Sequence, residues 1–495
     1  MRSCFCNIIL MICLLSVARA GAQSTAFDAA VQAMTGKSLP QVNLQFNLSQ
    51  ASWQAFVPGN ITIARLNAGG QVETVAYDCR LRYRGMSAAF LMKKSFAVKL
   101  VDEDGEKLDA SLLGMRSDNN WILDAMAIDR LRMRNRVCFD VWNEISHVPW
   151  DTKYGNRNGT EGRFVEVFVN GNYNGVYCLT DKIDRKLLNL RKAVVGDDGA
   201  VAVKGLLYKG NNKTVSDTLL TYVDDDTNSE YWNSFELQYP DDYPSLSAWQ
   251  PLMDLIDFNG KSTDESFVEH YNEWYYRDNL IDYWIMINVF NIQDMPYKNT
   301  FLSTPDINFS HRYMLTPWDM DASLGLYYDG NYANYFSNAN RLSKFGPFNR
   351  LIPGNVDSIK QATAARWRQL LETTLAPNSI AWRINDYCRV LVESGAWQRE
   401  CAMWNGIPVP LRADIYAEAA YAITWYQNSV QRLDNTLKAW ARTDDDVINS
   451  AWVTRIYNYL LGRTTTPPSP KLDINSDGVI NSADITAIYT IILGS

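Results

Sequence analysis

The stretches Asn291-Ile-Gln-Asp-Met-Pro-Tyr-Lys-Asn299 and Thr316-Pro-Trp-Asp-Met-Asp321 decide which fold and which chemistry to expect from this chain. Asp294 precedes Asn299 by five residues, and two short apolar runs separate that pair from Asp319. The two runs predict strands joined by a turn. Such a hairpin would bring both carboxylates and the amide to one cleft.

This order of residues is typical of a phosphoryl-transfer site. There, one carboxylate serves as the base beside the acceptor hydroxyl, and an amide and a second carboxylate hold Mg²⁺ on the nucleotide phosphates. Hard oxygen ligands are the ones Mg²⁺ prefers. Asp and Asn are also common in ordinary turns, so the spacing alone does not separate a catalytic site from a structural loop.

The sequence before this stretch alternates between strand and helix patterns. Residues 41–100 alternate with a period of two and are divided by Gly-rich turns, which predicts an antiparallel sheet. Residues 119–145 have helical spacing. The runs 163–169 and 175–179 flank Asn170-Gly171, which predicts a hairpin.

The sequence around and after the decisive stretch predicts further elements. Residues 206–209 read as a short strand, 280–290 as a helix, and 299–302 and 312–315 as the two strands noted above. Residues 364–440 are rich in Ala, Leu, Arg and Trp at helical periods. The fold class predicted for the main domain is therefore α+β, with a helical end.

The N-terminus predicts export. Arg2 is followed by the apolar run 8–17 and by small residues up to Ala22, which indicates a signal peptide over residues 1–22, cut near Ala20 or Ala22. No later run is long enough to span a bilayer. We expect a secreted protein without a membrane span that is extracellular, held at the cell surface or periplasmic.

Composition excludes several classes of function. The net charge is −8 over 495 residues, and no run of Lys and Arg forms a basic stripe, so nucleic acid is not an expected partner. The three histidines form no HExxH pattern, and neither GxSxG nor GxGxxG occurs. Five cysteines remain beyond residue 22, too dispersed for a disulfide scaffold, although a bridge between Cys388 and Cys401 stays open.

The C-terminal residues 443–495 contain an internal repeat. The sequence Val447-Ile-Asn-Ser-Ala recurs as Val479-Ile-Asn-Ser-Ala, a period of 32 residues. Between the copies lies the Pro-rich sequence 464–470, which predicts a short stiff linker within residues 463–471. We call residues 443–495 the tail.

The second copy of the repeat predicts a calcium loop. Oxygen-bearing residues occupy positions 1, 3, 5, 9 and 12 around Gly478 at position 6, as a Ca²⁺ loop requires; they are Asp473, Asn475, Asp477, Asn481 and Asp484. The first copy has Ala441, Thr443 and Trp452 where ligands 1, 3 and 12 belong. One bound Ca²⁺ is expected.

With this loop and repeat, the tail resembles a dockerin module. The resemblance implies a small all-α unit that is stabilised by calcium and that docks onto a cohesin-like or cell-surface partner.

Four motifs of the main domain resemble the CotH family of secreted atypical kinases over about residues 44–326. They are Lys93-Lys-Ser-Phe96, Val169-Asn-Gly-Asn-Tyr-Asn-Gly-Val-Tyr177, Leu207-Tyr-Lys209 and Pro317-Trp-Asp-Met-Asp321. The resemblance implies a protein-kinase-like fold over residues 26–440, with a reduced N-lobe and a helical C-lobe whose last part is 331–440. It also implies ATP with Mg²⁺ or Mn²⁺, and transfer of the γ-phosphate to protein Ser/Thr or another extracellular acceptor.

The resemblance also implies roles for individual residues. Asp294 corresponds to the catalytic carboxylate, Asn299 and Asp319 to metal ligands, and Asp321 to a carboxylate on or beside the metal. The nucleotide-binding residues it implies are Lys94 at the phosphates, Asp181 and Lys182 near the adenine, and Lys209. Gln293 stands where the family usually has Trp, and Asp181 where Glu is commoner.

Two questions stay open at this point. Strand alternation places Lys94 on one face with Phe96 and Lys99 on the other with Ala97, so only one of the two lysines is expected to face the cleft. The resemblance favours Lys94. Two alternatives to an active enzyme are a pseudokinase or adhesin that only binds partners, and a component of a polysaccharide-degrading complex.

Overall fold

The computed structural model describes residues 24–85, 90–211, 218–223, 225–333, 342–441, 448, 450–464 and 469–493. The predicted signal peptide, residues 1–22, lies outside the described residues. So does part of the predicted linker, residues 465–468.

The N-terminal part is a closed β-barrel with the strand order β1-β2-β3-β4-β7-β9-β8. The strands are β1 (Gln41–Phe46), β2 (Val57–Leu66), β3 (Val72–Arg84), β4 (Ser95–Val101), β7 (Asn120–Asp124), β8 (Gly162–Val169) and β9 (Asn172–Thr180). A parallel pair, β1 with β8, closes the barrel, and the other neighbouring pairs are antiparallel. The antiparallel sheet predicted for residues 41–100 is confirmed.

The hairpin predicted around Asn170-Gly171 is also confirmed, as β8 and β9. Both turn residues have positive φ, 50° at Asn170 and 80° at Gly171, which suits the right-handed twist of the strands they join. Alternate side chains of the barrel strands fill its interior, for example Val42, Leu44 and Phe96. Helix α1 (Ala26–Gln32) packs outside, where Phe27 meets Phe168.

The single helical segment predicted for residues 119–145 is wrong in its first half. Residues 120–124 form strand β7, and only α2 (Arg134–Ile145) is helical. The apolar run Trp121-Ile-Leu123 pairs with β4 and β9 inside the barrel, and this tertiary pairing overrides the helical spacing. The Asp129 carboxylate accepts hydrogen bonds from the Met133 and Arg134 N–H groups and so caps the start of α2.

A five-stranded antiparallel sheet follows the barrel, in the order β13-β14-β12-β15-β16. Its strands are β12 (Leu206–Gly210), β13 (Tyr231–Trp232), β14 (Phe235–Tyr239), β15 (Thr300–Thr304) and β16 (Met314–Pro317). The strands predicted at 206–209, 299–302 and 312–315 are confirmed within two residues. Residues 291–299 therefore lie just before β15, and residues 316–321 lie at the end of β16; these two strands pair with each other.

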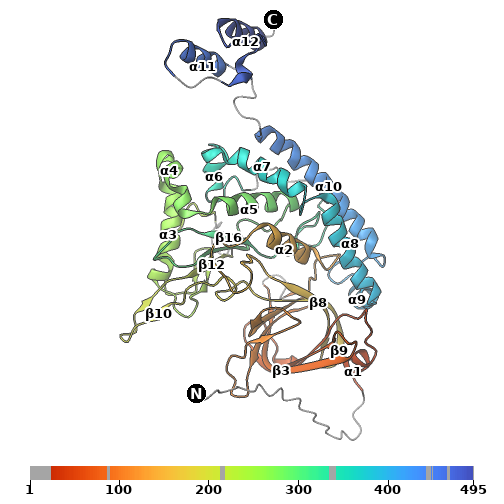
Figure 1. The fold of residues 1–495 in the computed structure, drawn as a ribbon. Coiled ribbons are helices and arrows are strands. Elements are labelled where there is room, and N and C mark those ends of the chain that lie inside the picture. Colours follow the sequence, from red (N-terminus) through yellow and green to blue (C-terminus); the bar gives the residue numbers. More distant parts are fainter. Residues whose placement is uncertain are drawn as a thin grey trace, which may run out of the picture.

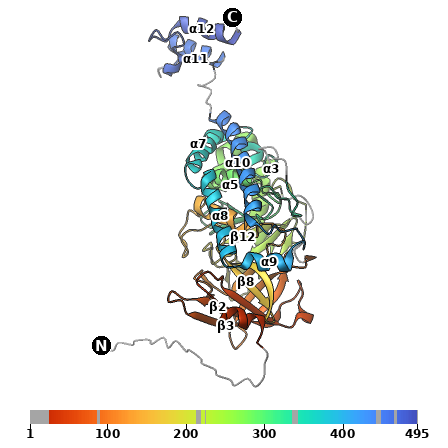
Figure 2. The ribbon, with the colours of Figure 1, turned by 90° about the vertical axis from the view of Figure 1, so that its right-hand side faces the viewer.

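Helices pack around this sheet, and the last but one of them also contacts strand β9 of the barrel (Figure 1). They are α3 (Leu246–Lys261), α4 (Asp264–Trp274), α5 (Arg277–Phe290), α6 (Phe348–Leu351), α7 (Ile359–Leu371), α8 (Pro377–Glu393), α9 (Ala396–Trp404) and α10 (Ile415–Trp440). Helix α5 is buried at every position from Asn279 to Phe290, and the turned view shows α10 running along it (Figure 2). The helix predicted at 280–290 and the helical region 364–440 are confirmed.

Shorter elements complete the main part of the chain. Two-residue strands form the pairs β5 (Ala110–Ser111) with β6 (Ser117–Asp118) and β10 (Val194–Val195) with β11 (Val201–Ala202). Cys388 is buried and Cys401 partly buried, and both are free thiols, so the bridge left open between them is wrong. None of the helices in the described part of the chain is long and apolar enough to cross a membrane.

The described part of the tail is helical, as predicted. Helices α11 (Ser450–Leu460) and α12 (Ser482–Leu493) pack through a small apolar core that includes Trp452, Ile456 and Ile488.

Candidate active site between the barrel and the five-stranded sheet

Two adjoining cavities lie where the barrel meets the five-stranded sheet. The smaller one, about 320 Å³, is lined by four carboxylates, and we call it the acidic cavity: Asp124, Asp294, Asp319 and Asp321. The larger one, about 690 Å³, is lined by six cationic side chains, and we call it the basic cavity: Arg82, Arg84, Lys99, Lys182, Lys209 and Lys298. Arg84, Lys298 and Asp319 line both cavities, so the two form one cleft.

The loop between α5 and β15 supplies Asp294 and Asn299. Helix α5 ends at Asn291, whose left-handed backbone (φ 49°) turns the chain out of the helix toward the cleft. The Lys298 ammonium lies 2.8 Å from an Asp294 carboxylate oxygen. Asn299 also has positive φ (63°), and its N–H donates to the Gly210 carbonyl oxygen at 3.1 Å, which ties this loop to the end of β12.

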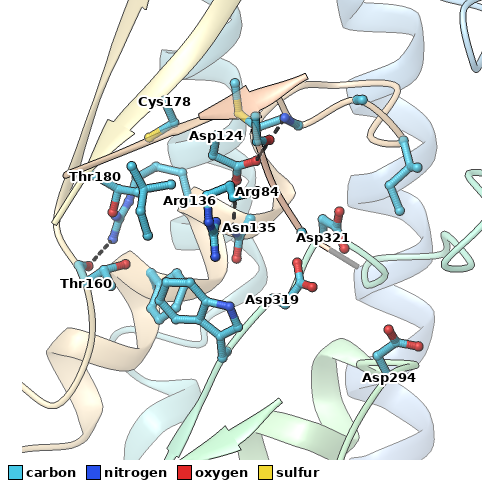
Figure 3. Close-up of a pocket in the computed structure, with 18 of the residues that line it drawn as sticks. Arg84, Asp124, Asn135, Arg136, Thr160, Cys178, Thr180, Asp294, Asp319 and Asp321 are labelled. Carbon is cyan, nitrogen blue, oxygen red and sulfur yellow. Dashed lines mark hydrogen bonds between the residues drawn. The ribbon is translucent and has the colours of Figure 1, made fainter. Parts of the chain in front are cut away.

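The turn after β16 supplies Asp319 and Asp321. Asp319 has φ 57°, a conformation that is uncommon for residues other than glycine and that aims its side chain into the cleft. The N–H of Met320, between the two carboxylates, donates to Asn135 Oδ1 at 3.0 Å. Asn135 Nδ2 in turn donates to an Asp124 carboxylate oxygen at 3.2 Å. Figure 3 shows these side chains around the acidic cavity.

Burial and neighbouring carboxylates raise the pKa of two side chains of the acidic cavity, Asp319 and Asp321. Burial, then the charges of Asp319 and Asp124, hold the pKa of Asp321 well above its ordinary value. Burial, then Asp124 and Asp294, also raise the pKa of Asp319, while Lys209 and Arg84 oppose that rise. Burial and the neighbouring carboxylates therefore disfavour the ionised form of Asp319 and Asp321.

The residues of the cleft fit a divalent cation that is shared with a phosphate. In the described part of the chain no three His, Cys, Asp or Glu side chains form a complete metal cage. Mg²⁺ does not need one, because it is usually held by one or two carboxylates together with substrate phosphates and water. Asn299 is 2% exposed, and its Nδ2 has no hydrogen-bond partner among the described residues, so it can donate to a phosphate oxygen. Its Oδ1 would be the atom that binds the cation, and Asp319 lines the same cavity.

Of the two lysines weighed for the nucleotide, the structure brings Lys99 to the cleft. Ala97 and Lys99 line the basic cavity, whereas Phe96, on the opposite face of β4, packs in the barrel. Lys94 lines neither cavity: its ammonium lies 5.7 Å from the centre of the Tyr83 ring. This arrangement does not support Lys94 as a nucleotide ligand.

Of the other residues implied for the nucleotide, two line the cleft and one does not. Lys182 and Lys209 line the basic cavity. Asp181 does not, because its buried carboxylate is held by Arg116 and Arg157, each at 2.9 Å. Asp181 therefore fixes the end of β9 and is turned away from the cleft.

The residues of the cleft that sequence reasoning missed include Arg84, Asp124, Asn135 and Lys298. Lys298 had a visible signal, because it lies four residues after Asp294 inside the decisive stretch. Asp124 and Asn135 lie in the segment that was expected to be a single helix. No pattern in the sequence indicated that β7 and α2 bring them opposite Asp319.

Comparison with known proteins gives two matches. The family model described as CotH kinase protein matches residues 81–440, and the one described as Dockerin type I domain matches residues 443–493. No curated protein matches the chain significantly. The first match covers the cleft from the end of β3 to the turn after β16, without Trp53, Gln54 and Phe56 of the basic cavity, and the second covers the tail.

Proposed function

Because the chain belongs to the CotH kinase protein family and ends in a dockerin type I domain, we propose that it is a secreted kinase tethered through its tail. The reaction is transfer of the ATP γ-phosphate to Ser or Thr of a protein, or to another extracellular acceptor. The observation that carries the proposal is the meeting of Asp294, Asn299 and Asp319, from two separate loops, along one cleft with cationic walls.

In this proposal Asp294 takes the proton of the acceptor hydroxyl. Asp294 lines the acidic cavity and not the basic one, so the acceptor enters from the acidic side. The Lys298 ammonium lies 2.8 Å from this carboxylate and holds it in place at the wall of the acidic cavity.

The phosphates of ATP occupy the basic cavity next to Asp319. Arg84, Lys209 and Lys298 line it there and balance the negative charge that shifts between the phosphate oxygens during transfer. Burial lowers the pKa of the Lys209 ammonium, and the charges of Glu236 and Asp319 oppose that change. Mg²⁺ or Mn²⁺, held by Asn299, Asp319 and Asp321, would supply further neutralisation of the phosphates.

The tail contributes calcium-dependent attachment to a cohesin-like or cell-surface partner. The side chains of the proposed ligands are held by the backbone of their own loop. The Asp473 carboxylate accepts hydrogen bonds from the Asp477 and Gly478 N–H groups at 3.0 and 2.8 Å. Asp484 accepts from the Ile474 and Asn481 N–H groups, both at 2.8 Å. Gly478 has φ 84°, the turn that position 6 of such a loop requires.

Purified protein given γ-labelled ATP with Mg²⁺ or Mn²⁺ tests the proposal, with casein as acceptor and nucleotide binding followed by thermal shift. Asp319→Ala should abolish transfer, because a carboxylate that holds the cation is lost. Asp294→Asn should slow turnover about a hundredfold or more but leave ATP binding nearly unchanged, since the base is lost and the phosphate site is not.

Asp254→Asn is the matched control, because this carboxylate lies on α3 outside both cavities and should leave transfer at the wild-type rate. A wild-type protein that neither binds ATP with either metal nor transfers label would end the kinase proposal. The binding-only alternatives, an adhesin or a component of a polysaccharide-degrading complex, would then take its place.

A further inference from the structure

Cationic side chains outnumber carboxylates on the wall of the basic cavity. Six cationic side chains line it, against the two carboxylates of Glu236 and Asp319. Arg84, Lys209 and Lys298 lie within electrostatic reach of Asp319 or Asp294. We call the remaining three, Arg82, Lys99 and Lys182, the outer cations.

The outer cations are not held by salt bridges in the described part of the chain, although the charge of Asp241 acts on Lys99. Among the residues that the structure describes, none of the three forms an ion pair, in contrast to Lys298 with Asp294. Burial lowers the pKa of Lys99, and the like charges of Lys182 and Arg82 lower it further. Arg82 Nε is buried without a hydrogen-bond partner. Three cations that repel one another at the wall of a cavity are a site that an anion stabilises.

Aromatic side chains share this end of the cavity with the outer cations. The aromatic ring of Phe56 lines it, but the Arg82 guanidinium carbon lies 4.8 Å from the ring centre and the Lys99 ammonium 4.7 Å. Both cations therefore make cation–π contacts with the Phe56 ring. Trp121 also lines the cavity but is 1% exposed, whereas Trp53, on the same wall, is 54% exposed.

We propose that the outer cations extend the phosphate-binding surface of the cleft, so that linear inorganic polyphosphate serves as a phosphoryl donor alongside ATP. The inference rests on the proposed kinase function, because it uses the same acceptor side and the same Asp294. A polyphosphate chain carries negative charge at every phosphate, whereas the nucleoside half of ATP carries none. Polyphosphate therefore matches a cavity whose cations continue beyond the neighbourhood of Asp319.

The step is the same as with ATP. The acceptor oxygen forms a bond to the terminal phosphorus of the chain, and the bridging P–O bond to that phosphorus breaks. The bridging oxygen keeps the electron pair and leaves as the end of a chain one phosphate shorter. The proton of the acceptor hydroxyl passes to Asp294, and no oxidant or further reactant is needed.

The test compares donors on the full chain. Casein is incubated with Mg²⁺ or Mn²⁺ and either ATP, tripolyphosphate or a longer linear polyphosphate, and phosphorylated residues are identified by mass spectrometry. Wild type should phosphorylate casein with ATP and with the longer polyphosphate. Lys99→Gln and Lys182→Gln should each raise the KM for polyphosphate about tenfold, the loss expected for one hydrogen bond to a charged group, and change the KM for ATP less.

Lys107→Gln is the matched control. It removes the same charge close to Lys99, yet Lys107 does not line the cavity. Transfer from ATP with none from polyphosphate would overturn this inference and leave the kinase proposal standing. Equal KM values for polyphosphate in the Lys99, Lys182 and Lys107 variants would also overturn it, because the outer cations would then not be the binding surface. No transfer from any donor would instead remove the kinase proposal itself.

Discussion

Asn135 links the two sides of the acidic cavity through a single amide group. Its oxygen accepts the Met320 N–H, between Asp319 and Asp321, and its nitrogen donates to Asp124 on β7. The turn that carries the two carboxylates is thus held in position from α2. We regard Asn135 as a positioning residue, because it acts through the residues it holds.

We predict that Asn135→Ala lowers kcat and raises the Mn²⁺ concentration needed for half-maximal activity, by about tenfold or more, as is usual when a group that orients a metal ligand is lost. Asn143→Ala is the control: Asn143 lies on the same helix, and its amide donates to the Thr160 carbonyl oxygen at 2.8 Å, away from the turn. Steady-state kinetics with Mn²⁺ titrations measure both variants. If the two variants behave alike, the assigned role of Asn135 is wrong.

The sequence predicted only part of the site at this scale. Asp294, Asn299 and Asp319 were found because a hairpin in sequence order brings them together. Strand alternation placed Lys99 and Lys94 on opposite faces. Which of the two faces borders the cleft is known only once the barrel interior is known. Asp124 and Asn135 reach the cleft through tertiary packing, and a single sequence carries no local signal for it.

Among the elements, α9 is joined to the barrel by a buried charge cluster around Glu400. The Glu400 carboxylate accepts hydrogen bonds from Lys93 Nζ at 2.6 Å and from Arg132 Nε at 2.7 Å. It also accepts the Val176 N–H of β9 at 2.7 Å. Gly175 has φ 106°, and a Cβ there would meet Glu400 Oε2 at 2.4 Å, so only glycine fits beside this carboxylate.

We predict that Glu400→Gln destabilises the protein far more than Lys93→Met. The first variant leaves the Arg132 guanidinium, and Lys93 whenever it is protonated, buried without a counter-charge, which costs about 3 kcal/mol or more. The second keeps the contact of Glu400 with Arg132 and the Val176 N–H. Urea unfolding of both variants measures the difference in free energy of unfolding, and equal losses would contradict the account of this cluster.

The same cluster makes stability depend on pH. Burial, opposed mainly by Glu400, lowers the pKa of Lys93 from 10.5 to about 7 in the folded protein. Between these two pH values the unfolded chain binds a proton that the folded chain does not, so the free energy of unfolding rises with pH. Lys93→Met should remove this rise. Urea unfolding from pH 7 to 10 checks it, and identical slopes for wild type and Lys93→Met would refute the assignment.

In the tail, calorimetry should detect one Ca²⁺ bound per chain, because only the second copy of the repeat keeps its oxygen ligands. Asp473→Ala should abolish the binding, since this carboxylate occupies position 1 of the loop. Asp28→Ala, in the capping box of α1, is a control that should bind Ca²⁺ normally. Two equivalents for wild type, or none, would contradict the assignment.

On the scale of the whole molecule, two apolar cores meet at the cleft. One fills the barrel, and the other joins the five-stranded sheet to the helices. Alternation and turn signals predicted the strands and the α+β class, because those signals are local. Closure of the barrel depends on the parallel pairing of β1 with β8, which are far apart in sequence, so no local pattern indicated it.

The central claim is that this cleft transfers phosphate. The most direct measurement is the intact mass of the purified wild-type protein and of Asp319→Ala after incubation with ATP and Mn²⁺. The account predicts that wild type gains whole phosphate groups on its own Ser or Thr residues, and that Asp319→Ala gains none. A wild-type mass that stays unchanged, with casein also unmodified and no nucleotide bound, would contradict the account.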